Sequence, residues 1–115
     1  MDFLLSYNNF KSNDFKNRYL NVTSLNKVYN LFSAKIIGFS VNKIPIKAIS
    51  IGNGNIKILI WSQMHGNETT STKALIDFIY FLNNNTYLNS CFTFKIIPIL
   101  NPDGAETYSL SLIHI

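Results

Sequence analysis

The sequence has little cysteine, few charged residues and no long apolar run. Cys91 is its single cysteine, so an internal disulfide is impossible. We expect its thiol to be a small buried hydrophobe rather than a nucleophile, because the sequence places no base beside it. No segment approaches the roughly 18–20 apolar residues of a membrane span, and Asp2 stands where a secretory signal carries a base. These absences predict a cytoplasmic protein with no membrane partner.

Charged residues make up 14% of the 115 residues, whereas 47% are apolar. This composition supports one hydrophobic core, belonging to a single domain or to part of one. Ten Lys and Arg residues outnumber six Asp and Glu residues and give a net charge of +4, but they are scattered along the chain. Since nucleic-acid-binding proteins gather basic residues on one face, we expect no nucleic-acid partner.

The first part of the chain predicts a lead-in segment followed by a short helix. Residues 1–20 are rich in Asn and Lys around scattered aromatic side chains, which indicates an irregular or partly helical segment. Apolar residues then recur at helical spacing, and Thr23 or Ser24 is available as an N-cap. The apolar positions of this predicted helix are Leu25, Val28, Tyr29 and Phe32.

Two apolar segments in the middle of the chain predict a β-hairpin. Residues 43–51 and 56–61 are separated by Gly52-Asn-Gly-Asn55. Asn-Gly between two apolar segments is a strong signal for a type I′ turn, since both central residues of that turn need a positive φ. Pro45 cannot donate a ladder hydrogen bond, so it places the start of the first strand at an edge or a bulge.

Strand, helix and strand patterns follow one another between residues 58 and 100. Residues 58–61 are continuously apolar, as expected for a strand covered on both faces, and residues 92–100 form a second apolar strand. The helical stripe between them ends at residues 83–85, and its members are Ala74, Leu75, Phe78, Ile79 and Leu82. Short links make this segment a parallel βαβ unit. The sequence therefore predicts an α/β fold whose mixed sheet contains a hairpin and a parallel βαβ unit.

His65 and Glu68 lie between the first strand and the helix of that unit. Parallel strands end at the same sheet edge, where open α/β sheets bind ligands. Zinc binds imidazole nitrogen and carboxylate oxygen, and a catalytic zinc uses three protein ligands and a water. Gly66 suits a tight bend that directs both side chains at one point. The alternative is a surface histidine and a glutamate that interacts with the helix dipole. Spacing and placement leave both interpretations open.

Two segments resemble the zinc carboxypeptidases of peptidase family M14, most closely its bacterial branch. They are Ile60-Trp-Ser-Gln-Met-His-Gly-Asn-Glu-Thr-Thr70 and Ile97-Pro-Ile-Leu-Asn-Pro-Asp-Gly-Ala105. The resemblance covers residues 15–108 and implies the N-terminal half of a zinc-carboxypeptidase-like fold. It implies that Zn²⁺ is the cofactor and that His65 and Glu68 bind it. It further implies hydrolysis of the C-terminal peptide bond of a peptide substrate.

The resemblance assigns a structural role to the second motif. Asn101-Pro-Asp-Gly104 corresponds to a turn that leads into the substrate-binding segment of the family. We therefore expect Asn101, Asp103 and Gly104, together with Gly66, to be turn residues near the site. Glu106 is the other acid close to this motif, and it precedes the position expected of a general base by most of a domain.

The family pattern also requires residues that have no counterpart here. They are a clamping arginine, an Asn-Arg pair, a third zinc-binding histidine and a general-base glutamate. We expect no catalytic residue in this chain. His114 is not expected to be the third ligand, because the family-like pattern stops after Tyr108. Our hypothesis is that residues 109–115 are a non-native tail translated from sequencing-adapter DNA. Residues 21–108 would then be a partial carboxypeptidase-like domain, inactive alone.

Two other functions remain open. A zinc deacylase that acts on N-acyl amino acids also uses His-Gly-Asn-Glu, so an N-acyl amino acid is an alternative substrate to a peptide. Asn-Pro-Asp-Gly, rather than Asn-Pro alone, favours the peptidase. A non-catalytic α/β binding domain with the same strand-helix scaffold is the second alternative.

Overall fold

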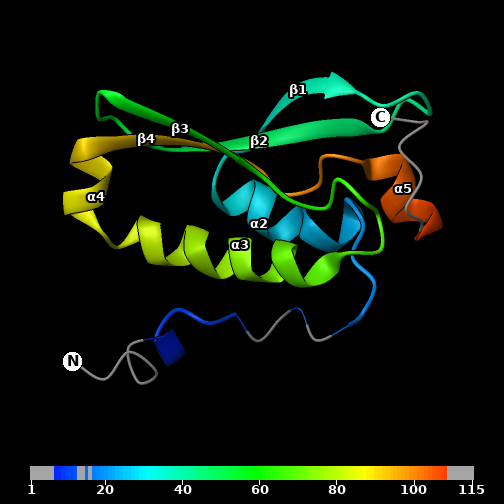
Figure 1. Cartoon of the computed structure of the whole chain (residues 1–115), viewed down its shortest axis with the longest axis horizontal. Helices are drawn as coiled ribbons and strands as arrows, with labels where there is room; N and C mark the ends of the chain where they lie inside the picture. Colours follow the sequence, from blue (N-terminus) through cyan, green and yellow to red (C-terminus); the bar gives the residue numbers. More distant parts are fainter. Residues whose placement is uncertain (1–6, 13–14, 16, 109–115) are drawn as a thin grey trace.

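The computed structural model describes residues 7–12, 15 and 17–108 (Figure 1). The predicted tail at residues 109–115, with His114, and the first six residues of the lead-in segment lie outside the described residues. The elements of the described part are, in chain order, η1 (Thr23–Leu25), α2 (Asn26–Leu31), β1 (Lys35–Phe39), β2 (Pro45–Gly52), β3 (Ile56–Trp61), α3 (Thr69–Asn83), α4 (Thr86–Cys91), β4 (Phe92–Ile97) and α5 (Pro102–Thr107).

The strands form a mixed sheet, and α2 and α3 lie against one of its faces (Figure 1). The strand order within the described part is β1-β2-β4-β3. β2 pairs antiparallel with both β1 and β4, whereas β3 pairs parallel with β4. Since α3 and α4 connect β3 to β4, the predicted α/β class and the parallel βαβ unit are confirmed.

The hairpin is present, but its predicted position is wrong. β2 and β3 do not pair, because β4 lies between them. The hairpin consists instead of β1 and β2, with Lys35 opposite Ala48 and Phe39 opposite Pro45. The insertion of β4 gives the apolar residues Phe94 and Ile96 a neighbouring strand on each side. The Asn-Gly turn signal is local, so it does not reveal that β4 pairs between β2 and β3.

The Gly-Asn-Gly-Asn loop passes over the beginning of β4 instead of forming a type I′ turn. The backbone N–H of Asn53 donates to the carbonyl of Asn89 at 2.9 Å, and that of Gly54 donates to the carbonyl of Phe92 at 3.1 Å. A Cβ on Gly54 would lie 2.0 Å from the carbonyl carbon of Cys91. Glycine is therefore needed here for a close backbone approach.

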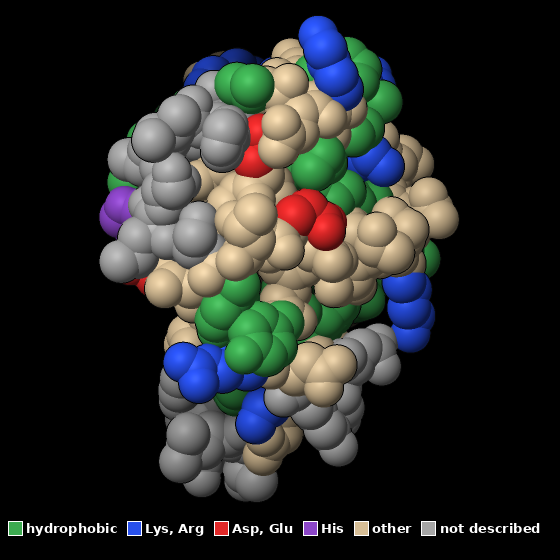
Figure 2. All heavy atoms as spheres, turned by 90° about the vertical axis from the view of Figure 1, so that its right-hand side faces the viewer, with side chains coloured by type: hydrophobic (Ala, Val, Ile, Leu, Met, Phe, Trp, Pro, Cys, Tyr) green, Lys and Arg blue, Asp and Glu red, His purple; other side chains and the backbone are tan. Residues whose placement is uncertain are grey.

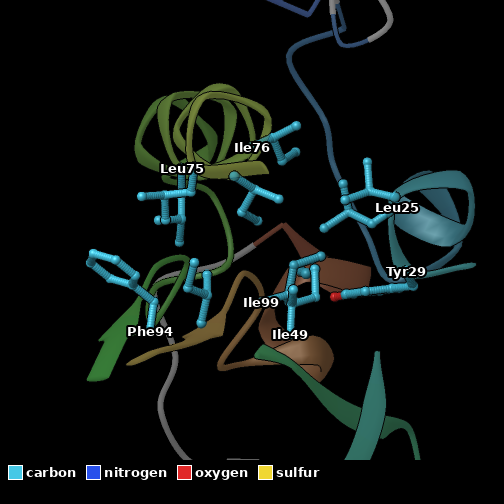
Figure 3. Packing of buried hydrophobic residues seen from close by; sticks show 12 residues of the cluster. Leu25, Tyr29, Ile49, Leu75, Ile76, Phe94 and Ile99 are labelled. Carbon is cyan, nitrogen blue, oxygen red and sulfur yellow. The ribbon is translucent and has the colours of Figure 1, made fainter. Parts of the chain in front are cut away.

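Buried apolar side chains fill the space between the sheet and the helices (Figure 3). Leu75 and Ile76 of α3 pack into the cluster that also contains Ile49 of β2 and Phe94 of β4. Leu25, the last residue of η1, completes the cluster beside α2 and is fully buried. Each such side chain contributes about 1.5–3 kcal/mol on burial, so this layer fixes α3 against the sheet.

The core-facing residues of the first helical segment are confirmed, but its cap is different. Leu25, Val28 and Tyr29 are buried. Instead of Thr23 or Ser24 acting as N-cap, Asn21 accepts a hydrogen bond on Oδ1 from the backbone N–H of Ser24 at 3.0 Å. Asn21 has a short polar side chain of the kind that caps helices, and it lies two or three residues before the predicted caps. The helical segment begins with the 3₁₀ turn η1.

The buried face of α3 is close to the predicted stripe and rotated slightly from it. Leu75, Ile79 and Leu82 are buried as predicted, whereas Ala74 is exposed and Ile76 is buried. The helix ends at Asn83, within the predicted range. The larger Ile76 removes more apolar surface from water than Ala74 would, which accounts for the rotation.

The segment after α3 contains a helix that the sequence did not predict. In α4, the Oδ1 of Asn85 caps the helix by accepting a hydrogen bond from the backbone N–H of Leu88 at 3.0 Å. Cys91, at the end of α4, is a free thiol and is half-buried rather than fully buried as predicted. β4 then ends at Ile97, before the predicted end at residue 100; the next residue, Pro98, has no N–H to donate.

β3 is not covered on both faces, contrary to the prediction from its continuous apolar run. It lies at an edge of the described sheet. Ile58 and Ile60 face the core, whereas Leu59 and Trp61 point to the opposite face and are 56% and 49% exposed. The outer sheet face therefore presents large apolar side chains to solvent.

The described part of the lead-in segment packs on the side of α3 that faces away from the sheet (Figure 1). Buried Asp77 of α3 accepts hydrogen bonds from the hydroxyl of Tyr7 and, at 2.7 Å, from the backbone N–H of Ser12. The bond to Asp77 raises the pKa of Tyr7, because it stabilises the protonated phenol. The rings of Phe10 and Phe81 lie 5.1 Å apart. Asp77 therefore anchors the segment.

Of the helices in the part of the chain that the structure describes, none is long and apolar enough to cross a membrane.

The exposed apolar residues of β3 predict self-association of the 115-residue chain, because exposed edge strands pair readily with other chains. Leu59→Glu should shift the chain toward the monomer in sedimentation velocity, since it removes an apolar side chain opposite Lys95 and adds a favourable charge pair. Tyr87→Glu, at a 74% exposed position on α4, is the matched control and should leave association unchanged. A wild-type chain that stays monomeric at every concentration would contradict this expectation.

Candidate metal centre

The loop after β3 brings the two predicted metal ligands together. The Nδ1 atom of His65 lies 3.1 Å from the Oε2 atom of Glu68, and the two side chains are 32% and 60% exposed. The backbone N–H of Glu68 donates to the carbonyl of His65 at 3.1 Å and closes the turn between them. Glu68 is also the residue that precedes the first turn of α3. One turn therefore holds an imidazole and a carboxylate side by side at the surface.

The loop after β4 lies beside this turn because the pairing of the two strands continues past their ends. The backbone N–H of Ser62 donates to the carbonyl of Ile97 at 3.1 Å, and the carbonyl of Ser62 accepts from the backbone N–H of Leu100 at 3.0 Å. One residue further, the carbonyl of Gln63 accepts from the backbone N–H of Asn101 at 3.2 Å. Parallel pairing thus carries both motifs to the same edge of the sheet.

Gly66 and Gly104 form the tightest contact between the two loops. A Cβ on Gly66 would lie 1.9 Å from the carbonyl carbon and oxygen of Gly104. No side chain fits in that space, so the two backbones touch directly. This contact fixes the distance between the His65–Glu68 turn and the start of α5.

The second motif starts a helix, which corrects its interpretation as a simple turn. Asn101 is the N-cap of α5, and its Oδ1 accepts a hydrogen bond from the backbone N–H of Gly104 at 2.9 Å. Pro102 occupies the first helical turn, where a missing N–H has no cost. Figure 2 views the end of the molecule that faces right in Figure 1, on the side of α5, and a histidine side chain reaches the surface at its margin.

Asp103 links this helix to the β1–β2 turn. It is 1% exposed, accepts a hydrogen bond from the Ser40 hydroxyl at 2.5 Å and another from the backbone N–H of Asn42 at 3.2 Å. Ser40 also accepts from the backbone N–H of Ile44 at 3.0 Å. Asp103 is therefore enclosed and fully engaged, which suits a structural role. Glu106, on the same helix, is exposed.

His65 and Glu68 suit zinc in their chemistry, since imidazole nitrogen and carboxylate oxygen are two of its usual donors. Within the described ranges, no group of three or more His, Cys, Asp or Glu side chains is placed to hold a metal ion. The donors that the described chain offers at this edge are thus two of the three that a catalytic zinc site uses.

A depression of about 690 Å³ adjoins Glu68 and is lined by Arg18 and Tyr108 among others. The Nε–H of Arg18 donates to the Tyr108 hydroxyl at 3.1 Å, and this bond raises the pKa of the guanidinium. The Thr69 hydroxyl donates to the carbonyl of Arg18 at 2.7 Å and ties its backbone to α3. A permanently positive side chain therefore lines the same depression as the candidate zinc-binding carboxylate.

A family model described as zinc carboxypeptidase, peptidase family M14, matches residues 22–111. The chain belongs to this family. It is 29% identical to the γ-D-glutamyl-L-diamino acid endopeptidase 1 of Lysinibacillus sphaericus, in an alignment that covers 74% of the chain and 24% of that enzyme. The family is defined by zinc-dependent enzymes, which agrees with the donor chemistry of His65 and Glu68.

Solved structures of metallo-carboxypeptidases share this fold. A metallo-carboxypeptidase of Pseudomonas aeruginosa matches with a TM-score of 0.65 and 18% identity, covering 80% of the chain and 28% of the enzyme. One from Burkholderia cenocepacia matches with a TM-score of 0.58 and 23% identity, covering 75% of the chain and 27% of the enzyme. The chain thus spans about a quarter of the length of these relatives.

Sequence reasoning missed the polar residues that hold the two loops. Gln63 is 2% exposed and Ser40 is 5% exposed, and both are hydrogen-bonded to the site loops. Ser40 gave no signal, because its partner lies 63 residues away. Gln63 had a weak signal in the sequence, because it is a polar residue between an apolar strand and a motif that must bend sharply.

Gly66→Ala should destabilise the fold, because the added methyl would overlap the backbone of Gly104. Overpacking of this kind costs about 1–3 kcal/mol, measurable by urea unfolding. Gly38→Ala is the matched control, since a Cβ on Gly38 has no atom within 4 Å. Equal stability of the Gly66→Ala and Gly38→Ala variants would show that the backbone contact is not as close as described.

Asp103→Ala should lower the free energy of unfolding by about 1–3 kcal/mol, because it leaves the buried Ser40 hydroxyl without this acceptor. In a double-mutant cycle, the variant with both Asp103→Ala and Ser40→Ala should lose less stability than the sum of the two single variants, since the two side chains share one hydrogen bond. Glu106→Ala, exposed on the same helix, should change stability by less than about 0.5 kcal/mol. Additive effects of Asp103→Ala and Ser40→Ala would refute the link.

Proposed function

We propose that this chain supplies two zinc ligands, His65 and Glu68, to a metallocarboxypeptidase that hydrolyses the C-terminal peptide bond of its substrate. The observation that carries the proposal is the 3.1 Å approach of the two side chains at the carboxyl edge of the sheet, in a chain that belongs to the zinc carboxypeptidase family. We further propose that residues 21–108 form only part of the catalytic domain.

The residues of this chain have positioning and binding roles in the proposed reaction. His65 would offer the lone pair of an imidazole nitrogen, and Glu68 would offer a carboxylate oxygen. When bound, zinc polarises the scissile carbonyl and lowers the pKa of a bound water. Gly66 and Gly104 keep the turn against α5, where a side chain would push the two loops apart. Asp103, which is buried and bonded to Ser40, supports this edge rather than taking a proton from water.

The proposed site is incomplete within the described residues, because they offer no third His, Cys, Asp or Glu for the metal. The described residues near the two motifs also offer no candidate for a general base: Asp103 is enclosed, and Glu106 extends from the far part of a short helix. The solved relatives are between three and four times as long as the matched segment. We therefore infer that the third ligand, the base and the arginine that grips the substrate carboxylate come from further sequence, and that the 115-residue chain is inactive alone.

The alternatives are less well supported. The deacylase hypothesis rests on His-Gly-Asn-Glu alone, whereas the family match spans both motifs. The name of the Lysinibacillus relative specifies cleavage at a diamino acid next to a γ-linked D-glutamate, so a peptide of that type is a second substrate class to assay. A non-catalytic domain would be favoured if the gene, read onward, lacked another histidine and a late glutamate.

Zinc binding by the chain itself tests the proposal. Calorimetric titration should show weak one-to-one uptake of Zn²⁺, because two ligands hold the ion less firmly than three. His65→Ala and Glu68→Ala should abolish this uptake, while His114→Ala and Glu106→Ala should leave it unchanged. No hydrolysis of C-terminal peptide bonds is expected from any of these chains. Uptake that survives His65→Ala, or that requires His114, would contradict the proposed ligand pair.

A further inference from the structure

Gln63 is a buried polar side chain near the candidate site whose amide group is fully hydrogen-bonded. It is 2% exposed, and its Nε2 donates to the carbonyl of Gly66 at 3.0 Å and to that of Leu20 at 2.7 Å. Its Oε1 accepts from the Thr72 hydroxyl at 2.9 Å. Both N–H donors and the amide oxygen are thus used, and the partners fix which atom is nitrogen.

The backbone of Gln63 is as constrained as its side chain. Its φ is +51°, a left-handed conformation that is uncommon outside glycine and costs of order 1 kcal/mol or more. Its carbonyl accepts the backbone N–H of Asn101 at 3.2 Å. This strained conformation turns the chain away from β3 and places the side chain inside the loop. Such strain persists only where surrounding contacts hold it.

The bond to Gly66 connects Gln63 to the two candidate ligands. Gly66 lies between His65 and Glu68 in sequence. The orientation of its carbonyl therefore determines the path of the backbone from His65 to Glu68. The N–H of Glu68 closes this turn onto the carbonyl of His65 at 3.1 Å. A rigid carbonyl of Gly66 therefore limits how far the two side chains move apart.

From these contacts we propose that Gln63 is a positioning residue of the metal centre. Its carboxamide orients the His65–Glu68 turn through the carbonyl of Gly66 and ties it to α3 through Thr72. Its side-chain hydrogen bonds go to Leu20, Gly66 and Thr72, so it acts on the candidate ligands through the turn. This inference rests on the proposed function for the identity of the ligands, but the hydrogen-bond geometry is independent of any metal.

Variants of similar size separate positioning from stability. Gln63→Met has nearly the same length and removes every hydrogen bond of the side chain. Gln63→Asn keeps an amide and tolerates the left-handed conformation, but it is one methylene too short to reach its partners. Thr70→Val, at an exposed position on α3, is the matched control, because the side-chain hydrogen bonds of Gln63 go to other residues.

The first measurement uses the metal-free 115-residue chain. Amide hydrogen exchange at Glu68 reports whether the turn is closed, since that N–H donates to the carbonyl of His65. Gln63→Met and Gln63→Asn should lose protection at this amide while amides in the middle of α3 keep theirs. Thr70→Val should keep protection at Glu68. Equal loss across the turn and α3 would indicate general destabilisation and would overturn the proposal.

The second measurement titrates Co²⁺, a paramagnetic substitute for zinc, and follows the NMR signals of the His65 ring. The apparent dissociation constant should rise about tenfold in the Gln63 variants, as for the loss of a residue that orients a metal ligand, and by less than about twofold in Thr70→Val. Unchanged affinity in a folded Gln63 variant would overturn the proposal. If neither Gln63 variant folds, the residue serves folding alone, and the proposal is again wrong.

The two measurements also separate this proposal from the proposed function. If Co²⁺ leaves the His65 signals of the wild-type chain unchanged, the ligand pair is wrong, and the proposed function fails. The hydrogen-exchange result then still decides whether Gln63 holds the turn. If the wild-type chain binds Co²⁺ and the Gln63 variants bind it equally well, only the positioning role fails.

Discussion

The backbone contact between Gly66 and Gly104 is the constraint on which the rest of the candidate site depends. It exists because β3 and β4 are parallel and their pairing continues through Ser62 and Gln63. A single Cβ on Gly66 would lie 1.9 Å from Gly104, so the two motifs approach each other as bare backbone. This approach places the His65–Glu68 turn and the N-terminus of α5 at one edge of the sheet, with the hydrophobic core behind them.

Polar side chains, rather than the core, determine the detailed shape of this edge. Gln63 joins the turn to α3, and Asp103 joins α5 to the β1–β2 turn through Ser40. The side chains of Gln63, Asp103 and Ser40 are all buried and hydrogen-bonded. Buried polar groups make a structure rigid when they are bonded in this way. Asp77 has a similar function on the other side of α3, where it holds the lead-in segment. The hydrophobic layer supports the sheet, and these bonds orient the loops.

Much of the fold, and the proximity of His65 to Glu68, was predictable because the signals for them are local. Apolar periodicity predicted α3, and the strand–helix–strand order predicted the parallel βαβ unit and the common edge of the two motifs. The β2–β3 hairpin was wrong because its Asn-Gly signal is also local, whereas the insertion of β4 depends on contacts about 40 residues away. The exposure of Leu59 and Trp61 was missed because an apolar sequence does not say whether anything covers it. Gln63 was missed since its role needs the positions of Leu20, Gly66 and Thr72 together.

The central claim is that His65 and Glu68 are zinc ligands at the carboxyl edge of this sheet. Family membership, donor chemistry and the 3.1 Å approach of the two side chains support it. Anomalous diffraction at the zinc absorption edge, from crystals of the chain grown with Zn²⁺, tests it most directly. The account predicts a peak about 2.0–2.2 Å from both a His65 ring nitrogen and a Glu68 carboxylate oxygen. A zinc peak elsewhere on the chain, with none between these two side chains, would contradict it.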